Sequence, residues 1–303
     1  MRQTRTPLEK IVELKAIASP DNPIDRDALL RLAWDEPVKP AGEDRFRTLL
    51  LLVDPQMDFM EGGSLGVPGS IADAARTIHL IDRHLEAITK IMVSLDTHDP
   101  FQIFHPCWWT DRDGHNPPPF TTMTAEDVDS GRWLPVIYPE QSRAYVRALE
   151  ENGRQNLVIW PYHCLQGTAG CAMENQLANM IYFHSVARRT VVHKVVKGQD
   201  SLSEMYGIVR PENDDGSETN EALLQELSQY DRILVAGQAK SHCVLETLRQ
   251  ILDFAEGRPG LAERITLMDD CTSSIPGFES ATDEALSFLV ARFGIHRIRS
   301  TDL

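Results

Sequence analysis

Short apolar runs alternate with amphipathic stretches along the chain from residue 48 onward. The run 48–53, Thr-Leu-Leu-Leu-Leu-Val, and the run 91–95, Ile-Met-Val-Ser-Leu, are typical of strands that are buried on both faces. Between them, Ser70 and Asp73 have the spacing of a capping box and predict a helix from Ser70 to about Lys90. This alternation indicates an α/β protein with a parallel sheet.

The same pattern continues to the end of the chain. Further strands are predicted at 157–160, 190–196, 232–236, 264–268 and 295–299. Helical periodicity covers roughly 172–184, 219–229, 243–255 and 280–292. We therefore predict one doubly wound, Rossmann-like domain over 47–303, a three-layer α/β sandwich around about six parallel strands.

Two segments do not follow this alternation. Residues 1–46 contain five prolines around one short helical stretch, and we interpret them as an N-terminal arm that lies over the domain surface or on a neighbouring subunit. Residues 106–155 contain a proline-rich stretch and a helical run at 140–151. Such a long excursion between two strands is more often a lid, a substrate loop or an oligomer contact than an idle coil.

Composition and charge exclude several classes of partner and location. The 303 residues include 45 Asp and Glu but only 30 Lys and Arg, a net charge of −15, which argues against nucleic acid or an anionic membrane as partner. There is no apolar run of the ~18 residues that a membrane span requires and no apolar signal stretch near the start, so we expect a cytoplasmic protein. The five cysteines form no CxxC pair, which disfavours a disulfide framework or a structural zinc site.

Reactive residues follow five of the predicted strands. In an open parallel sheet, ligands bind beyond the carboxyl ends of the strands, so polar residues there are the first candidates for a site. One such residue alone indicates little, because an aspartate after a strand is often only a turn residue or a helix cap. The candidates are Asp54, Asp96, His98, His163, Lys197 and Cys243.

Asp96 and His98 suggest half of a divalent metal site. They are two residues apart, so in an extended segment both side chains point the same way. His163 would complete the site from a neighbouring strand end. The alternative is a solvated strand-end pair with an unrelated histidine. Of the other histidines nearby, His105 stays open as a further ligand, and His115 is interpreted as a loop residue.

Cys243 precedes an amphipathic helix, and the field at a helix N-terminus favours a thiolate. That field alone does not suffice. Lowering a thiol pKa from ~8.5 to below 7 requires about 2 kcal/mol, whereas a helix terminus supplies ~0.3–1 kcal/mol. Asp54 and Lys197 are the base and the cation available at adjoining strand ends. The alternative role of a buried cysteine is apolar packing, which we favour for Cys171 and Cys271.

Five segments together resemble a known family. They are 51–69 (LLVDPQMDFMEGGSLGVPG), 94–98 (SLDTH), 160–168 (WPYHCLQGT), 197–198 (KG) and 235–244 (VAGQAKSHCV). These segments are similar to the nicotinamidase branch of the isochorismatase-like cysteine hydrolases. The resemblance spans about residues 48–300, leaves out the N-terminal arm, and implies the isochorismatase-like hydrolase fold.

The resemblance also implies a set of site residues. The catalytic triad would be Asp54, Lys197 and Cys243, with an oxyanion hole formed by the backbone N–H groups of Ala239 and Cys243 and a cis peptide bond between Gln238 and Ala239. A divalent metal ion, with zinc expected and iron or manganese compatible, would be held by Asp96, His98 and His163. Phe59 and Trp160 would lie beside the substrate ring, with ordinary core packing as the alternative.

The implied activity is hydrolysis of nicotinamide to nicotinate and ammonia through a cysteine thioester, a step of NAD metabolism, by a dimer or tetramer. The sequence departs from the family pattern at Lys240 and Ser241, where Thr-Asp is common, and at His242, where an aromatic or aliphatic residue is frequent. These departures leave a second hypothesis open, hydrolysis of another small amide, ureide or carbamoyl compound. A third is a non-catalytic binding protein, because the fold does not fix the function.

Overall fold

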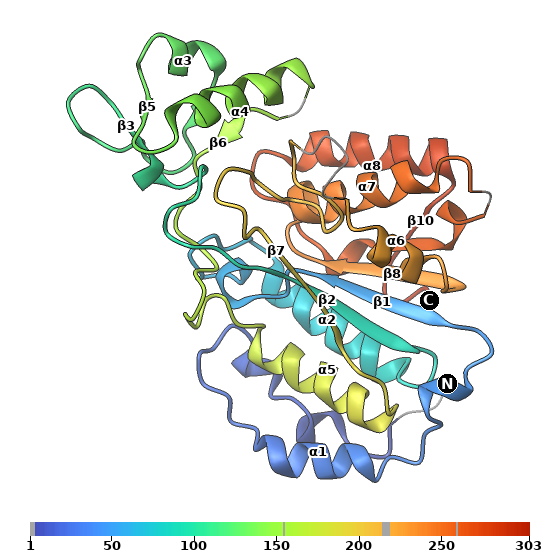
Figure 1. Cartoon of the computed structure of the whole chain (residues 1–303). Coiled ribbons are helices and arrows are strands. Elements are labelled where there is room, and N and C mark those ends of the chain that lie inside the picture. Colours follow the sequence, from blue (N-terminus) through green and yellow to red (C-terminus); the bar gives the residue numbers. More distant parts are fainter. Residues whose placement is uncertain (1–3, 154, 214–218, 259) are drawn as a thin grey trace.

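The centre of the computed structural model is a sheet of six parallel strands, in the order β10-β9-β8-β1-β2-β7 (Figure 1). The structure describes residues 4–153, 155–213, 219–258 and 260–303. The strands are β1 (Thr48–Val53), β2 (Lys90–Asp96), β7 (His193–Lys197), β8 (Arg232–Gly237), β9 (Ile265–Met268) and β10 (His296–Ile298). The predicted doubly wound sheet is confirmed, and its strand order reverses between β1 and β8.

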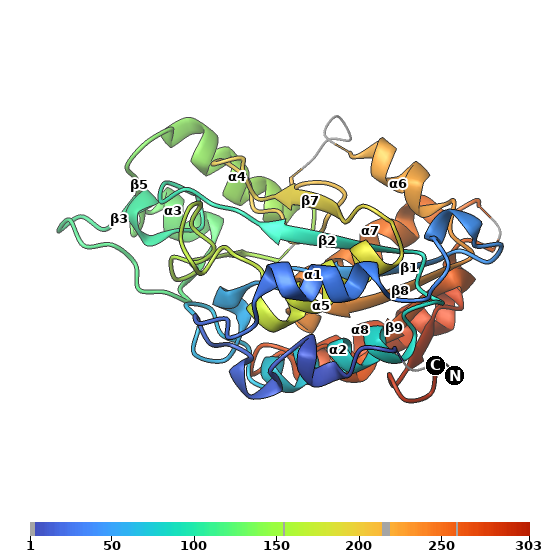
Figure 2. The same ribbon diagram turned by 90° about the horizontal axis from the view of Figure 1, so that it is seen from below.

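Helices cover both faces of the sheet, as Figures 1 and 2 show. On one face lie α2 (Ser70–Arg83) and α5 (Asn175–Ala187), and on the other lie α6 (Glu221–Leu227), α7 (Leu245–Ala255) and α8 (Glu279–Phe293). Side chains of a strand alternate between the faces, so Leu50 and Leu52 pack with α2 and α5 while Leu49 and Leu51 pack with α7 and α8. The continuous apolar run of β1 thus supplies both cores.

Among the described residues, no helix has both the length and the apolar character needed to cross a membrane.

The helix α2 differs from its prediction at both ends. Its N-cap is Gly69, with a φ of 93°, and the hydroxyl of Ser70 accepts a hydrogen bond from the N–H of Glu61 at 2.9 Å. The predicted capping box is therefore wrong, because the preceding loop uses the serine hydroxyl. The helix also ends at Arg83 rather than near Lys90, and the chain turns there before it enters β2.

The predicted strand at 157–160 does not belong to the central sheet. Only β6 (Leu157–Val158) forms, and it pairs antiparallel with β4 (Thr122–Met123). β4 lies in the excursion, and β6 follows it directly in the chain. The excursion gathers at one end of the sheet (Figure 1) and also contains β3 (Trp109–Thr110), β5 (Leu134–Pro135), α3 (Ala125–Asp129) and α4 (Pro139–Glu151). An apolar run of four residues packs equally well into this second core, which includes Trp108, Trp109 and Val146.

The N-terminal arm packs onto the domain that follows it in the chain. Its helix α1 (Arg26–Trp34) lies against α5 (Figure 2). Ile11, Leu29 and Ala33 are buried in the same cluster as α2 and α5.

Short 3-10 turns occur along the whole chain, at Leu8–Lys10, Leu14–Ala16, Ala41–Glu43, Met57–Phe59, Pro106–Trp108, Ala262–Arg264 and Asp269–Cys271.

A buried histidine of α5 is expected to make the fold sensitive to acid. The Nε2–H of His184 donates to the carbonyl oxygen of Ile88 at 2.9 Å, and burial lowers the pKa of His184 to about 4. The unfolded chain takes up this proton below about pH 6.5, so the stabilisation is complete above that pH and is lost as the pH falls toward 4. We expect this one group to lower the free energy of unfolding by about 2 kcal/mol between pH 7 and pH 5.

Urea unfolding at the two pH values measures this effect. The matched variant is His184→Gln, whose amide retains a donor but does not titrate. The decrease in unfolding free energy between pH 7 and pH 5 should be smaller in the variant than in the wild type. An equal decrease in both proteins would show that His184 is not the group that titrates.

Candidate active site

The carboxyl ends of four neighbouring strands bring most of the predicted site residues together. Asp54 follows β1, Asp96 ends β2 and Lys197 ends β7. Cys243 lies in a π-helical turn, Lys240–Val244, between β8 and α7. Since the strand order reverses between β1 and β8, these residues lie at the crevice where doubly wound sheets bind ligands.

Asp54, Lys197 and Cys243 form one buried group. The Nζ atom of Lys197 lies 3.0 Å from Oδ2 of Asp54 and 3.7 Å from Sγ of Cys243. The carboxylate of Asp54 acts on the thiol by raising its pKa. Its other oxygen, Oδ1, accepts a hydrogen bond from the hydroxyl of Ser94 at 2.6 Å, and the same hydroxyl oxygen accepts from the Asp54 N–H at 3.0 Å. The carboxylate is therefore held in place from two sides.

The charge state of this group follows from its burial. Burial raises the pKa of the Cys243 thiol well above its ordinary value, although the neighbouring Lys197 acts in the opposite direction. Burial also raises the pKa of Asp54 and is partly offset by Lys197. Burial alone would lower the pKa of Lys197, but Asp54 and Asp96 raise it well above its usual range. The resting group thus has an ammonium ion and a protonated thiol, so the expectation that the helix terminus favours a thiolate is overridden by burial.

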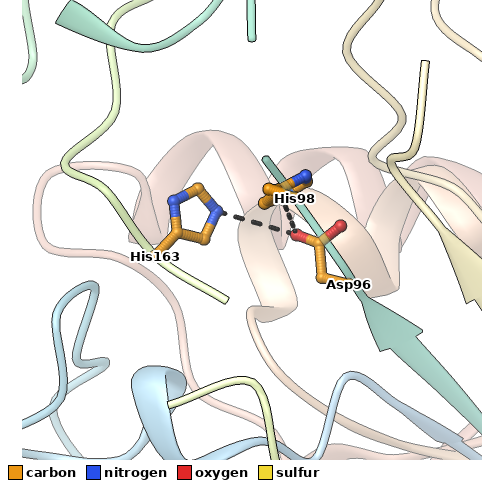
Figure 3. Close-up of side chains that lie close together, drawn as sticks. All are labelled: Asp96, His98 and His163. Atoms are coloured by element: carbon orange, nitrogen blue, oxygen red, sulfur yellow. Dashed lines mark ion pairs between the residues drawn. The ribbon is translucent and has the colours of Figure 1, made fainter. Parts of the chain in front are cut away.

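Asp96, His98 and His163 converge beside this group (Figure 3). Oδ2 of Asp96 lies 2.9 Å from Nε2 of His98 and 3.7 Å from Nε2 of His163. Nδ1 of His98 lies 2.9 Å from the carbonyl oxygen of Gly198, and Nδ1 of His163 lies 2.8 Å from that of Pro161. A carbonyl accepts only, so each Nδ1 carries the proton and each Nε2 presents a lone pair. Three lone-pair donors that face one another fit a divalent cation.

Neighbouring residues fix these candidate ligands. Gly198 has a φ of 75°, and a Cβ atom there would collide with the imidazole of His98 and the carboxylate of Asp96. The amide of Gln102 donates to the Gly198 carbonyl at 2.7 Å. The side chain of Gln56 both donates to and accepts from the backbone of Asp96, each at 2.7 Å. Nε2 of His98 is buried without a hydrogen-bond partner among the described residues, as expected for an atom that binds a cation.

His163 reaches this group by a route that the sequence did not predict. It does not follow a strand of the central sheet, because β6 ends at Val158 outside that sheet. Instead, the loop after β6 is held by two hydrogen bonds: the N–H of His98 donates to the carbonyl of Cys164 at 3.0 Å, and the N–H of Cys164 donates to Oδ2 of Asp58 at 2.7 Å. The predicted element was therefore wrong, although His163 still lies beside Asp96 and His98.

His105 lies near the candidate metal group but is not one of its members. Its ring centroid is 5.9 Å from that of His98 and 5.8 Å from that of His163. Its Nδ1 donates to the carbonyl of Pro100 at 3.1 Å. Burial and the two neighbouring histidines lower the pKa of His105 to about 3, so its ring is neutral at pH 7.

A pocket of about 20 Å³ adjoins the thiol, which is room for about one water molecule. Phe59 and Trp160, the two aromatic residues predicted to lie beside a substrate, are both in its wall. The peptide bond between Gln238 and Ala239 is cis, as the resemblance implied. The lining residues are Phe59, Leu65, Asp96, Trp160, His163, Glu204, Tyr206, Ala239, His242, Cys243 and Ile275.

Three residues of the site were missed in the sequence. Nε1 of Trp160 donates to Oε2 of Glu204 at 3.1 Å and to the hydroxyl of Tyr206 at 3.2 Å, and burial raises the pKa of Glu204 to about 7. Glu204 and Tyr206 come from an irregular segment that has no periodic signal. Ser94, which holds Asp54, could have been found, because it is a single hydroxyl within the buried apolar run of β2.

Comparison of the sequence with protein families gives no match, and comparison with curated proteins gives none either. Solved structures do match. The yeast nicotinamidase Pnc1p bound to the inhibitor nicotinaldehyde is 20% identical, with a TM-score of 0.59 over 83% of this chain and 99% of that one. A nicotinamidase pyrazinamidase of Acinetobacter baumanii is 20% identical, with a TM-score of 0.57 over 86% and 99%. PnC1 from L. infantum in complex with nicotinate is 18% identical, with a TM-score of 0.52 over 85% and 95%. The chain therefore has the fold of the nicotinamidases.

Proposed function

We propose that this protein is a metal-assisted cysteine amidohydrolase that converts nicotinamide and water to nicotinate and ammonia. One observation carries the proposal. The ammonium of Lys197 lies between the carboxylate of Asp54 and the thiol of Cys243, at 3.0 and 3.7 Å, and all three are buried at the crevice of the sheet. A nucleophile, a base and a cation in mutual contact are what attack on an amide requires. The shared fold with named nicotinamidases supports the choice of substrate.

Each residue of the site has its own role in the reaction. Asp54 takes the thiol proton as Sγ of Cys243 forms a bond to the amide carbonyl carbon. The N–H groups of Ala239 and Cys243 donate to the oxygen that becomes negative, and Lys197 balances the buried negative charge. Asp54 then gives its proton to the leaving nitrogen, so that ammonia departs and a thioester remains. A water molecule, deprotonated by Asp54, then attacks the thioester and the carbon–sulfur bond breaks. Asp54 returns the proton to the Cys243 sulfur, and the acid leaves the site.

Asp96, His98 and His163 would hold the metal ion, and zinc, iron or manganese suits this set of one carboxylate and two imidazoles. When bound, the ion supplies a positive charge that holds an acceptor nitrogen of the substrate ring. Phe59 and Trp160 would lie against the flat ring. Since the pocket has room for about one water molecule, side chains of its wall must shift when a ring enters.

Ammonia release from nicotinamide by the purified protein tests this proposal. We expect kcat/KM above about 10⁴ M⁻¹s⁻¹, an ordinary value for an enzyme with its own substrate. The same assay with ureides and carbamoyl compounds tests the second hypothesis from the sequence. Release from one of those alone would keep the reaction class and overturn nicotinamide as the substrate. No release from any of them by a metal-loaded protein would contradict the proposal.

Removal of the metal is expected to stop the reaction. His163→Ala removes one of the three candidate ligands, and we expect elemental analysis to show that the variant has lost its divalent ion. Ammonia release should fall at least about 100-fold, and a chelator should have the same effect on the wild type until metal is added back. The control is His79→Ala, an exposed histidine of α2 that is in no candidate metal group of the described residues, and it should leave both readouts unchanged. A His163→Ala variant that keeps its metal would refute the ligand assignment.

A further inference from the structure

His242 is a buried polar side chain that the proposed reaction does not use. It immediately precedes the nucleophile, and 4% of its surface is exposed. Its ring makes edge-on contacts with three aromatic rings, with centroid distances of 5.4 Å to Trp160, 5.5 Å to Tyr206 and 4.8 Å to Phe278. These contacts fix the plane of the imidazole and the directions in which its two nitrogens point.

The hydrogen bonds around Ser241 determine where the imidazole proton lies. The Ser241 hydroxyl oxygen accepts a hydrogen bond from the N–H of Ile275 at 3.1 Å and lies 2.8 Å from Nδ1 of His242. Among the described residues, Nδ1 is the only acceptor within hydrogen-bond distance of the hydroxyl's own proton. The hydroxyl therefore donates to Nδ1, which carries a lone pair, and the ring proton is on Nε2. Burial lowers the pKa of His242 to about 4, so the ring is neutral at pH 7 and has this one N–H.

This N–H is available to a ligand. Nε2 of His242 is buried and has no hydrogen-bond partner among the described residues. A buried donor without a partner is destabilising, and a ligand that accepts from it recovers that cost. His242 and Tyr206 line both the small pocket at Cys243 and a larger groove of about 1560 Å³, whose wall includes residues of α4, α7 and α8. The two side chains thus stand where the pocket meets the groove.

The negative charge of the groove wall limits which substituents of a ligand can extend into it. Within the described part of the chain, its wall has two arginines, and each is paired with a glutamate of the same wall, Arg249 with Glu246 at 3.6 Å and Arg292 with Glu256 at 2.6 Å. An anionic substituent would therefore be repelled, and a neutral one would not. The carboxylates of the wall are Asp200, Glu212, Glu246, Asp253, Glu256 and Glu284.

We propose that His242 is a specificity-determining residue whose Nε2–H donates a hydrogen bond to an uncharged acceptor on the substrate. This assignment rests on the proposed function and names its substrate class more closely. Among the aromatic amides that the site accepts, those that carry a neutral oxygen or nitrogen acceptor on the side facing the groove would be favoured over unsubstituted nicotinamide. Ser241 is a positioning residue, because it holds the imidazole in the tautomer that donates.

Matched pairs of ligands test the hydrogen bond. Each pair consists of a methoxy and an ethyl derivative of nicotinamide at the same open ring carbon, which differ in the acceptor but hardly in size. Binding is measured by calorimetry in a Cys243→Ala background, so that no turnover occurs. At one ring position we expect the methoxy compound to bind about fivefold tighter than its ethyl partner, the ratio that a neutral hydrogen bond gives. A carboxylate at that position should bind more weakly than the methoxy group.

Two further substitutions at His242, added to the Cys243→Ala background, test whether its Nε2–H causes the preference. His242→Phe keeps a ring among the three aromatic neighbours but removes the donor, and the methoxy preference should fall to about one. His242→Gln keeps a donor and should retain part of the preference. The inference is wrong if no methoxy compound binds better than its ethyl partner, or if the preference survives in His242→Phe.

Nitrogen NMR of the histidine ring gives an independent readout. The Cys243→Ala protein should show His242 with a protonated Nε2 and an unprotonated Nδ1, and Ser241→Ala should change that distribution. A protonated Nδ1 would overturn the proposal. Wild-type turnover of unsubstituted nicotinamide separates the two proposals. Turnover without any methoxy preference would support the proposed function and exclude the role of His242. A methoxy preference without turnover would support the role of His242 and exclude the proposed function.

Discussion

Replacement of Cys243 by alanine is expected to lower kcat for ammonia release by at least about four orders of magnitude, while the bound metal stays in place. The thiol is the only group of the triad that would form a bond to the substrate carbon, so no neighbour can replace it. Among the described residues, its sulfur accepts a hydrogen bond from Nζ of Lys197 and none from the two candidate histidine ligands. The measurements are single-turnover ammonia release and elemental analysis of the same sample.

Cys271→Ala is the matched control. This thiol is also buried, and it packs with α2 on the opposite face of the sheet from Cys243. The same chemical change there should leave kcat unchanged. Metal loss in Cys243→Ala, with metal retained in Cys271→Ala, would contradict the separation of nucleophile and metal group.

A thiol-directed aldehyde separates an enzyme from a binding protein of the same fold. Nicotinaldehyde is the inhibitor bound in the yeast nicotinamidase structure. Addition of the Cys243 thiol to an aldehyde forms a carbon–sulfur bond and a hydroxyl group, so the mass of the protein increases by one aldehyde. We expect this adduct in the wild type and not in Cys243→Ala. An unreactive wild-type thiol would favour the binding protein.

Replacement of Lys197 by methionine is expected to remove both activity and much of the stability. The ammonium lies 3.0 Å from Asp54 and 3.2 Å from Asp96, and all three side chains are buried. Without it, two carboxylates stay in the interior without a cation, and breaking such a buried pair costs about 3–5 kcal/mol. Urea unfolding of metal-free protein measures the loss, because bound metal would itself offset the carboxylate charge.

Two comparisons sharpen this prediction. Lys90→Met breaks a partly exposed ion pair with Glu226 at 2.8 Å and should cost at most about 1 kcal/mol. Adding Asp54→Asn to Lys197→Met removes one of the unpaired charges and should recover part of the stability without any activity. If Lys197→Met is no less stable than Lys90→Met, the ammonium does not hold the carboxylates in the way described.

Burial on both faces explains which parts of the fold were predictable. Strands such as β1 and β8 are continuous apolar runs, so the sequence marks where each ends, and Asp54 and Cys243 could be located from those ends. The run at 157–160 has the same composition but packs into the core of the excursion. A short apolar run does not specify which of two cores receives it, because both bury it equally well.

The other properties that the sequence did not reveal depend on contacts made only in the folded protein. The pKa of Cys243 is governed by burial, which a position before a helix does not reveal. Glu204 and Tyr206 reach Trp160 from an irregular segment, whose path depends on tertiary contacts rather than on any period. The His242 tautomer likewise depends on the hydroxyl of Ser241 and the N–H of Ile275, residues 34 positions apart.

The docking of α1 on α5 has a consequence for synthesis on the ribosome. The arm buries Ile11, Leu29 and Ala33 against a helix that lies about 150 residues later in the chain. At a translation rate of about 5–20 residues per second, these apolar side chains wait roughly ten seconds or longer for their partner. During that interval they are a ready target for chaperones that bind nascent chains. The speed at which this protein is translated, and not only its final stability, therefore sets how long it is prone to aggregate.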